Sequence, residues 1–123
     1  MTVKVLVFDD DLIAHPSFLG SVAQFVYRPH ADDAITDVLA VRPVLVLMDF
    51  SMGTAIDGAT AVRTLRARFP ALPIVGISSD ARMNRIMIEA GATDGVPKMA
   101  LPESLRFVLS LALPEPLEDE HPG

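Results

Sequence analysis

Residues 3–11 carry the sequence VKVLVFDDD, a valine-rich apolar run that ends in three consecutive aspartates. A short run of this kind is typical of a strand buried on both faces of a parallel sheet. The run VLVLM at residues 44–48 leads in the same way into Asp49. The run PIVGI at residues 73–77 leads into Ser78. Open parallel sheets bind their ligands beyond the carboxyl ends of the strands, so these polar residues mark the expected functional edge.

The segments between these runs have the apolar spacing of helices, with start and stop signals at their ends. Aspartates at residues 32–33 precede the first segment, and Asp57 precedes the second. Gly91 ends the third, and Pro114 ends the last. Strands that alternate with such helices predict an α/β fold, a doubly wound parallel sheet with helices on both faces. The apolar stripes are Ile35, Val38 and Leu39; Val62, Leu65 and Phe69; Met83, Ile86, Met87 and Ala90; and Leu105, Val108, Leu109 and Ala112.

Two parts of this pattern are weakly signalled. A helix and a strand are expected between Leu12 and His30, but Pro16 would interrupt a helix that began at once. We expect this helix to begin at Pro16, after a longer loop, with a short second strand at residues 25–28. A fifth strand is expected at residues 93–96.

Composition narrows the class of protein. The chain has 123 residues, enough for one domain with its own core, and it contains no cysteine, which excludes a disulfide framework and a thiol nucleophile. With 16 acidic residues against 10 basic ones the formal net charge is −6, which argues against binding to nucleic acid. Apolar runs stay well short of the roughly 18 residues of a membrane span. We therefore expect a cytoplasmic protein with no membrane partner.

The acidic charge is unevenly distributed. Residues 114–123, PEPLEDEHPG, hold 4 of the 16 acids and are too polar and proline-rich to pack, so we expect a disordered acidic tail. Residues 1–113, the expected domain, carry 12 acids and 10 bases. Four of those acids are the aspartates at residues 9–11 and Asp49. A concentrated acidic pocket on a nearly neutral body favours a cation site.

The residues that follow the strands form a chemically coherent set. Asp9 and Asp10 follow the first strand, Asp49 the third, Ser78 the fourth and Lys98 the fifth. Carboxylates hold Mg²⁺, whereas serine and lysine donate hydrogen bonds to phosphate-like oxygens. Taken singly, each has a plainer interpretation, as a helix cap, a strand-end acid or a surface lysine. Together they predict a site for a divalent cation and an anion.

In this order and spacing the residues resemble the receiver domain of bacterial two-component response regulators. Supporting pieces are RP at residues 42–43, DG at residues 57–58 and EAGA at residues 89–92. The resemblance covers about residues 3–113. It implies a flavodoxin-like sheet with strand order 2-1-3-4-5.

The resemblance also implies a phosphorylation switch. Asp49 would accept a phosphoryl group from a histidine kinase, a phosphotransfer protein or a small acyl phosphate, and Lys98 and Ser78 would contact its oxygens. Such a chain is a phosphoacceptor that hydrolyses its own acyl phosphate, not an enzyme with a separate substrate. Its output would be a protein partner bound near the last two helices. The implied magnesium ligands are Asp9 through water, Asp10, Asp49 and the backbone carbonyl of Ser51.

The chain departs from the family pattern where the signal would be transmitted. Met52 is followed by Gly53 instead of proline, and Lys98 by Met99 instead of proline. We expect a trans bond after Lys98, because a cis bond to a residue other than proline costs about 2.5 to 4 kcal/mol. Gly95 stands where the family has a switch aromatic. These departures favour intact phosphorylation chemistry with an altered output, and they leave open a receiver that binds partners without phosphorylation.

Other features have two interpretations each. Phe107 and Leu111, four residues apart on the last helix, predict either packing beneath the tail or a homodimer surface. A small phosphatase is disfavoured, because Ser51 stands where such hydrolases carry a second acid. The basic residues of the helix after Asp57 are expected to form a solvated face; they are Arg63, Arg66 and Arg68.

Overall fold

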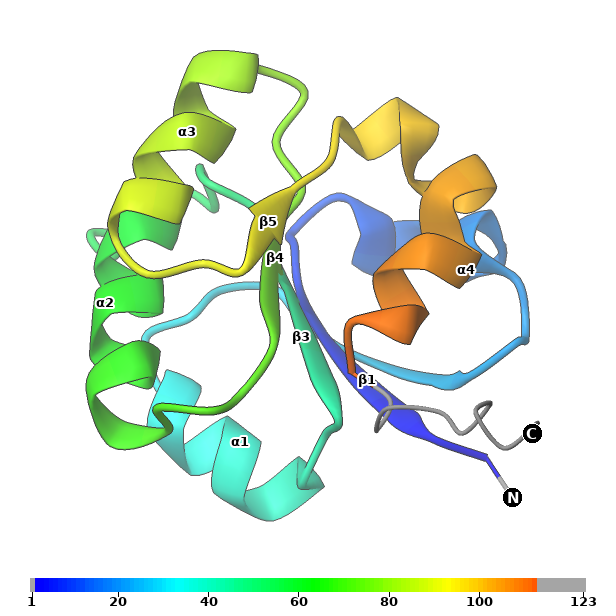
Figure 1. The fold of residues 1–123 in the computed structure, drawn as a ribbon, viewed down its shortest axis with the longest axis horizontal. Helices are drawn as coiled ribbons and strands as arrows, with labels where there is room; N and C mark the ends of the chain where they lie inside the picture. The colour runs from blue at the N-terminus through cyan, green and yellow to red at the C-terminus, as the bar shows by residue number, and fades with distance from the viewer. Residues whose placement is uncertain (1, 113–123) are drawn as a thin grey trace, which may run out of the picture.

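The structure, a computed structural model, describes residues 2–112 (Figure 1). The expected acidic tail lies outside the described residues. Five strands form one parallel sheet in the order β2-β1-β3-β4-β5, which confirms the predicted doubly wound α/β fold and its strand order. The strands are β1 (Lys4–Phe8), β2 (Gln24–Arg28), β3 (Leu45–Met48), β4 (Ile74–Gly76) and β5 (Asp94–Gly95). The α-helices are α1 (Ala34–Val41), α2 (Gly58–Arg68), α3 (Ala81–Glu89) and α4 (Leu101–Ser110).

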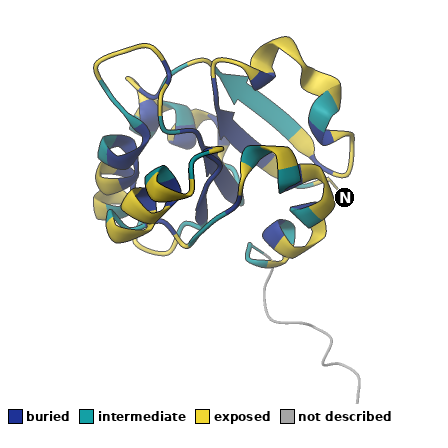
Figure 2. Ribbon diagram, turned by 90° about the horizontal axis from the view of Figure 1, so that it is seen from above, coloured by how far each residue is buried: buried dark blue, intermediate teal, exposed yellow. Residues whose placement is uncertain are grey.

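Two apolar cores lie on opposite faces of the sheet, because successive side chains of a strand point to opposite sides. Leu6 and Phe8 of β1 pack with the helices α1, α2 and α3 on one face. Val5 and Val7 pack with α4 on the other. Figure 2 shows the central strands as buried, with the exposed residues on the outer sides of the helices. Burial on both faces explains why the strands are continuous apolar runs in the sequence.

The predicted first helix is wrong as an α-helix. Two 3₁₀ turns stand in its place, η1 (Leu12–Ala14) and η2 (Pro16–Leu19). Pro16 does begin the second turn, as expected, but it has no N–H with which to continue hydrogen bonding from the first. Gly20 then ends the second turn with φ 72°. The sheet face beneath α4 is therefore closed by two short turns, each of which buries one leucine.

Two helices turn faces inward that differ from the predicted stripes. Leu39 is 50% exposed, because the inward side of the eight-residue α1 is set by Val38 and its neighbours one turn away. Ile86 is also exposed, and the inward positions of α3 are Asn84 and Met87 instead. A buried asparagine on this face was not predicted.

Arg66 corrects the expectation of a solvated basic face on α2. Its guanidinium donates to the carbonyl oxygens of Leu72 at 2.6 Å, Gly91 at 2.9 Å and Phe69 at 3.1 Å. The planar fork of arginine suits several acceptors at once. Arg66 therefore ties the carboxyl end of α2 to the turn that precedes β5.

None of the helices in residues 2–112 combines the length and apolar character needed to cross a membrane.

Candidate functional site

The site begins at the carboxyl ends of β1 and β3, which are neighbours in the sheet. The Asp49 N–H donates to the Phe8 carbonyl at 2.9 Å, so the residues that follow the two strands are held side by side. Asp9 is fully buried and Asp49 is largely buried, whereas Asp10 is exposed. One carboxylate oxygen from each of these three aspartates lies within 4.8 Å of the others. The structure thus brings together the acidic residues singled out in the sequence.

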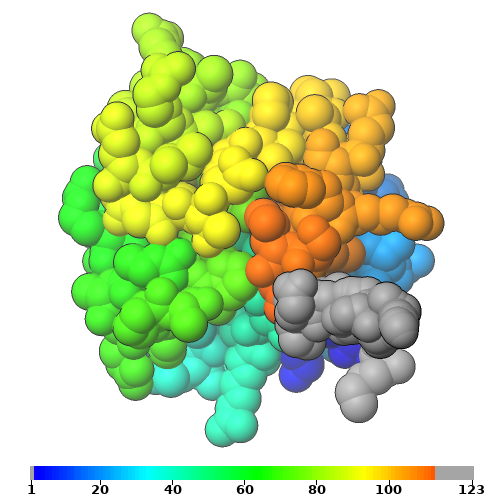
Figure 3. Space-filling model, in the orientation of Figure 1, coloured from blue at the N-terminus to red at the C-terminus, as the bar shows by residue number. Residues whose placement is uncertain are grey.

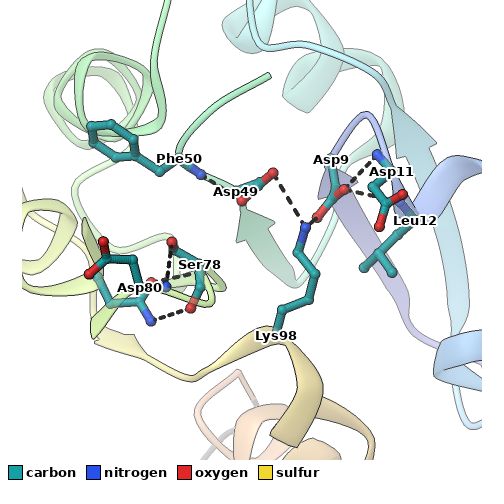
Figure 4. A network of polar contacts seen from close by, with 9 residues as sticks. Asp9, Asp11, Leu12, Asp49, Phe50, Ser78, Asp80 and Lys98 are labelled. Carbon is teal, nitrogen blue, oxygen red and sulfur yellow. Dashed lines mark hydrogen bonds and ion pairs between the residues drawn. The ribbon is translucent and has the colours of Figure 1, made fainter. Parts of the chain in front are cut away.

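Lys98 follows β5, the edge strand two places from β3 in the sheet, and its side chain extends to this acidic cluster. Its Nζ lies 2.7 Å from Asp9 Oδ2 and 3.4 Å from Asp49 Oδ2 (Figure 4). Residues 2–112 contain no cis peptide bond, so the bond between Lys98 and Met99 is trans, as expected. Pro97 is extended before the lysine, and a 3₁₀ turn, η3 (Lys98–Ala100), follows. The lysine therefore reaches both carboxylates without a proline after it.

The electrostatics of Asp49 and Lys98 are coupled. Burial raises the pKa of Asp49, and the charge of Asp9 raises it further, against smaller opposing effects of Lys98 and of the Phe50 N–H that donates to Asp49 Oδ1 at 2.9 Å. Burial alone would lower the pKa of Lys98, but its close ion pair with Asp9 Oδ2 and the two aspartate charges outweigh burial and raise it. Lys98 is therefore held as a cation, while ionisation of Asp49 is opposed.

The acidic cluster fits a hard divalent cation. Asp9 Oδ1 accepts from the N–H groups of Asp11 at 2.8 Å and Leu12 at 3.0 Å, which fixes the carboxylate. Asp9 Oδ2 is buried and accepts no well-aligned hydrogen bond from the described residues, although the Lys98 ammonium lies beside it. Three converging carboxylates, of which that of Asp9 is fixed by backbone N–H groups, form a donor set suited to Mg²⁺. Ser51, the expected carbonyl ligand, is exposed two residues beyond Asp49.

Ser78 lies at the end of β4, the next strand of the sheet, and is buried. Its Oγ accepts a hydrogen bond from the Asp80 N–H at 3.0 Å. In Figure 4 Ser78 lies beside Asp80, whereas dashed lines join the Asp49 carboxylate to Lys98 and to the Phe50 N–H. The hydroxyl oxygen is therefore bonded to the residue that precedes α3, and the hydroxyl hydrogen remains available for another acceptor.

Close packing places the loop after Asp49. A Cβ atom on Gly58, the first residue of α2, would collide with the Asp49 carbonyl oxygen and come within 2.8 Å of the Phe50 Cα. Asp57 caps the same helix by accepting from the Thr60 N–H at 2.8 Å. The Asp-Gly pair noted in the sequence thus serves both the helix start and the close approach of its backbone to Asp49.

Asn84 is a site-associated residue that sequence reasoning missed. Its side-chain amide accepts a hydrogen bond from the Ser78 N–H and donates one to the Ser78 carbonyl oxygen. The available signal was an asparagine one turn before Met87, on the inward side of a helix, where an apolar residue would be expected.

Comparison with known proteins identifies the family. No family model matches the sequence. The chain is 30% identical to the N-terminal receiver domain of RstA from Klebsiella pneumoniae, with a TM-score of 0.75 over 91% of this chain and 99% of that one. It is 21% identical to the receiver domain of the sensor histidine kinase PA1611 from Pseudomonas aeruginosa, with a TM-score of 0.76 over 91% and 98% of the two chains, a likeness that shows the fold. The chain belongs to the receiver domain family of response regulators.

A curated relative shares the same region as part of a longer protein. Protein-glutamate methylesterase/protein-glutamine glutaminase 1 of Pseudomonas aeruginosa is 35% identical over 108 residues. The match covers 80% of this chain and 29% of the relative, so the chain spans under a third of that protein. The activities in the relative's name are those of the relative.

Proposed function

We propose that this receiver domain accepts a phosphoryl group on Asp49, in a Mg²⁺-dependent reaction with phosphohistidine of a sensor kinase or phosphotransfer protein, or with a small acyl phosphate. The observation that carries the proposal is the position of the Lys98 ammonium between the carboxylates of Asp9 and Asp49. An Asp49 oxygen attacks phosphorus, and the bond from phosphorus to the histidine nitrogen or the acyl oxygen breaks. The histidine or the carboxylate of the donor leaves, and an aspartyl phosphate remains.

The surrounding residues have distinct proposed roles. Asp10 and Asp49, Asp9 through water, and the Ser51 carbonyl would hold Mg²⁺, which supplies positive charge against the incoming phosphoryl oxygens. Lys98, kept cationic by its neighbours, exchanges its contact with Asp49 for one with a phosphoryl oxygen. The Ser78 hydroxyl then donates to a second phosphoryl oxygen. The solved PA1611 receiver domain, which holds a magnesium ion coordinated in its active site cleft, supports the metal assignment by analogy of fold.

The output of the switch is proposed to be a protein contact. The helices α3 and α4 lie on one face of the molecule with the segment around β5 between them (Figure 3). A homodimer through α4 would rest on Phe107, which is 53% exposed, because Leu111 is only partly exposed and packs against the core beneath α4.

We further propose that the receiver spans residues 1–113, that residues 114–123 are an acidic extension, and that the protein acts in the cytoplasm.

Intact mass measurement after treatment with a small acyl phosphate and Mg²⁺ tests the proposal. We expect the mass of one phosphoryl group on the unsubstituted protein and none on Asp49→Asn. Asp33→Asn is the matched control, since Asp33 is an exposed aspartate whose side chain makes no helix-cap bond. No gain on the unsubstituted protein, or a gain that survives Asp49→Asn, would overturn the proposal. The first of these results would favour a module that binds its partner without phosphorylation.

A further inference from the structure

The buried side-chain amide of Asn84 makes two hydrogen bonds to the backbone of Ser78. The Ser78 N–H donates to Asn84 Oδ1 at 2.8 Å, and Asn84 Nδ2 donates to the Ser78 carbonyl at 2.9 Å. Asn84 is 6% exposed, and both hydrogen bonds are buried. An amide buried without partners would be costly, so the two bonds account for a polar residue on the inward face of α3. We call this pair of bonds the Asn84 clamp.

Two glycines make room for the Asn84 clamp. A Cβ atom on Gly95 of β5 would lie 2.8 Å from Asn84 Cβ, and one on Gly76 of β4 would lie 3.1 Å from Asn84 Oδ1. Both distances are shorter than ordinary van der Waals contact, so a Cβ on Gly95 would push Asn84 away, and one on Gly76 would crowd Met87 as well as Asn84. The asparagine therefore lies over the strand position where the family resemblance implies an aromatic. Close packing restricts its amide to the orientation that serves Ser78.

The Asn84 clamp fixes one part of Ser78 and leaves another able to move. The backbone N–H and carbonyl are bound by Asn84, while Oγ accepts from the Asp80 N–H at 3.0 Å. That last bond uses a lone pair of the hydroxyl, so its hydrogen is still able to donate. Rotation of one side-chain torsion redirects a serine hydroxyl, whereas moving the loop would break both bonds of the clamp.

We propose that Asn84 is a positioning residue for phosphoryl acceptance: it fixes the backbone of Ser78 so that side-chain rotation alone turns the hydroxyl to the phosphoryl group on Asp49. This role rests on the proposed function. Without the clamp, the β4–α3 loop must be ordered at each turnover, and the hydrogen bond from Ser78 is weakened. One neutral hydrogen bond is worth about 1 kcal/mol, so Asn84→Ala should slow phosphorylation about fivefold.

The clamp itself is tested without phosphorylation. Amide hydrogen exchange of the metal-free protein should show Ser78 protected, with protection reduced at least about fivefold in Asn84→Ala. Gly95→Ala should reduce it as well, because the added Cβ pushes Asn84 away while the asparagine is still present. Arg85→Ala, an exposed change on the same helix, should leave it unaltered. Unchanged protection of Ser78 in both test variants would overturn the proposal.

A double-mutant cycle separates positioning from a purely structural role. Limiting phosphorylation rates with a small acyl phosphate and saturating Mg²⁺ are compared for Asn84→Ala, Ser78→Ala and the double variant, beside unfolding curves for each. If Asn84 acts through the Ser78 hydroxyl, Asn84→Ala slows the unsubstituted protein but has no further effect once Ser78 is alanine. An equal slowing in both backgrounds would overturn the role of Asn84 alone. A failure of the unsubstituted protein to become phosphorylated would overturn the proposed function, and this role with it.

Discussion

Asp49 shows how a few neighbours set the chemistry of a single carboxylate. Burial and the charge of Asp9 both oppose its ionisation, while Lys98 favours it. A raised pKa in the native state means that ionised Asp49 costs native stability. This loss of stability is absent below the pKa of Asp49 in the unfolded state, and it reaches its full size once the pH exceeds the pKa of Asp49 in the native state. Metal-free protein therefore holds its proposed nucleophile in a destabilised charged form, which a bound cation would relieve.

The pKa of Asp49 should move in opposite directions when its two charged neighbours are removed. Asp9→Asn deletes the like charge and should lower the pKa, whereas Lys98→Met deletes the opposite charge and should raise it. Carboxyl carbon chemical shifts, followed by NMR through an acid titration of metal-free protein, report both changes. Lys4→Met is the control, because Lys4 is exposed at the opposite end of β1. A lower pKa in Lys98→Met would contradict the electrostatic account of the site.

At the scale of elements, sequence periodicity was most successful where burial alone decides the structure. The strands β1 and β3 could be predicted because their side chains are buried on both faces and leave uninterrupted apolar runs. Their ends also identified Asp9 and Asp49, since parallel neighbours share one edge of the sheet. The turns η1 and η2 could not be predicted, because Pro16 marks where a helix begins but not whether it continues.

Tertiary partners explain the other differences. Asn84 and Arg66 are polar residues whose hydrogen bonds are made to segments distant along the chain or to a loop outside their own helix. Periodicity assigns such residues to the solvent side, because it contains no information about those acceptors. Ile86 was assigned inward for the same reason. The buried positions of α3 are instead Asn84 and Met87, and the amide of Asn84 is satisfied by the backbone of Ser78.

The junction of α2 with the turn before β5 depends on the hydrogen bonds of Arg66. Arg66→Ala removes the donor of several partly buried carbonyl oxygens, and each such hydrogen bond contributes about 0.5 to 1.5 kcal/mol, so we expect a loss of about 1 to 3 kcal/mol of unfolding free energy. Arg66→Lys should recover little of the lost unfolding free energy, because one ammonium group cannot span the same acceptors. Chemical denaturation measures both.

Arg63→Ala is the matched control for this junction. Arg63 is exposed on the same helix, and surface changes of this kind are usually within about 0.5 kcal/mol. Equal losses for Arg63→Ala and Arg66→Ala would show that helix propensity, not the bonds of Arg66, stabilises the junction.

For the molecule as a whole, the acidic charge matters through where it is concentrated. The 12 acids and 10 bases of residues 1–113 nearly balance, yet three acids converge at one edge of the sheet. Folding brings these carboxylates together against their mutual repulsion, with Lys98 as a partial counterion. The cation site and the stability of the whole domain are therefore linked.

Mg²⁺ should stabilise the domain against unfolding, because the unfolded chain does not assemble the three carboxylates. Binding to the native state alone adds about 2.7 kcal/mol when the free ion is at 100 times its Kd. Thermal unfolding should shift upward with Mg²⁺ in the unsubstituted protein and in Asp33→Asn. Asp10→Asn should shift much less, because it removes a proposed ligand whose exposed side chain contributes little to the core. Sodium chloride at matched ionic strength separates binding from screening. An equal shift in sodium chloride, or a full shift in Asp10→Asn, would mean that the convergent aspartates do not form the cation site.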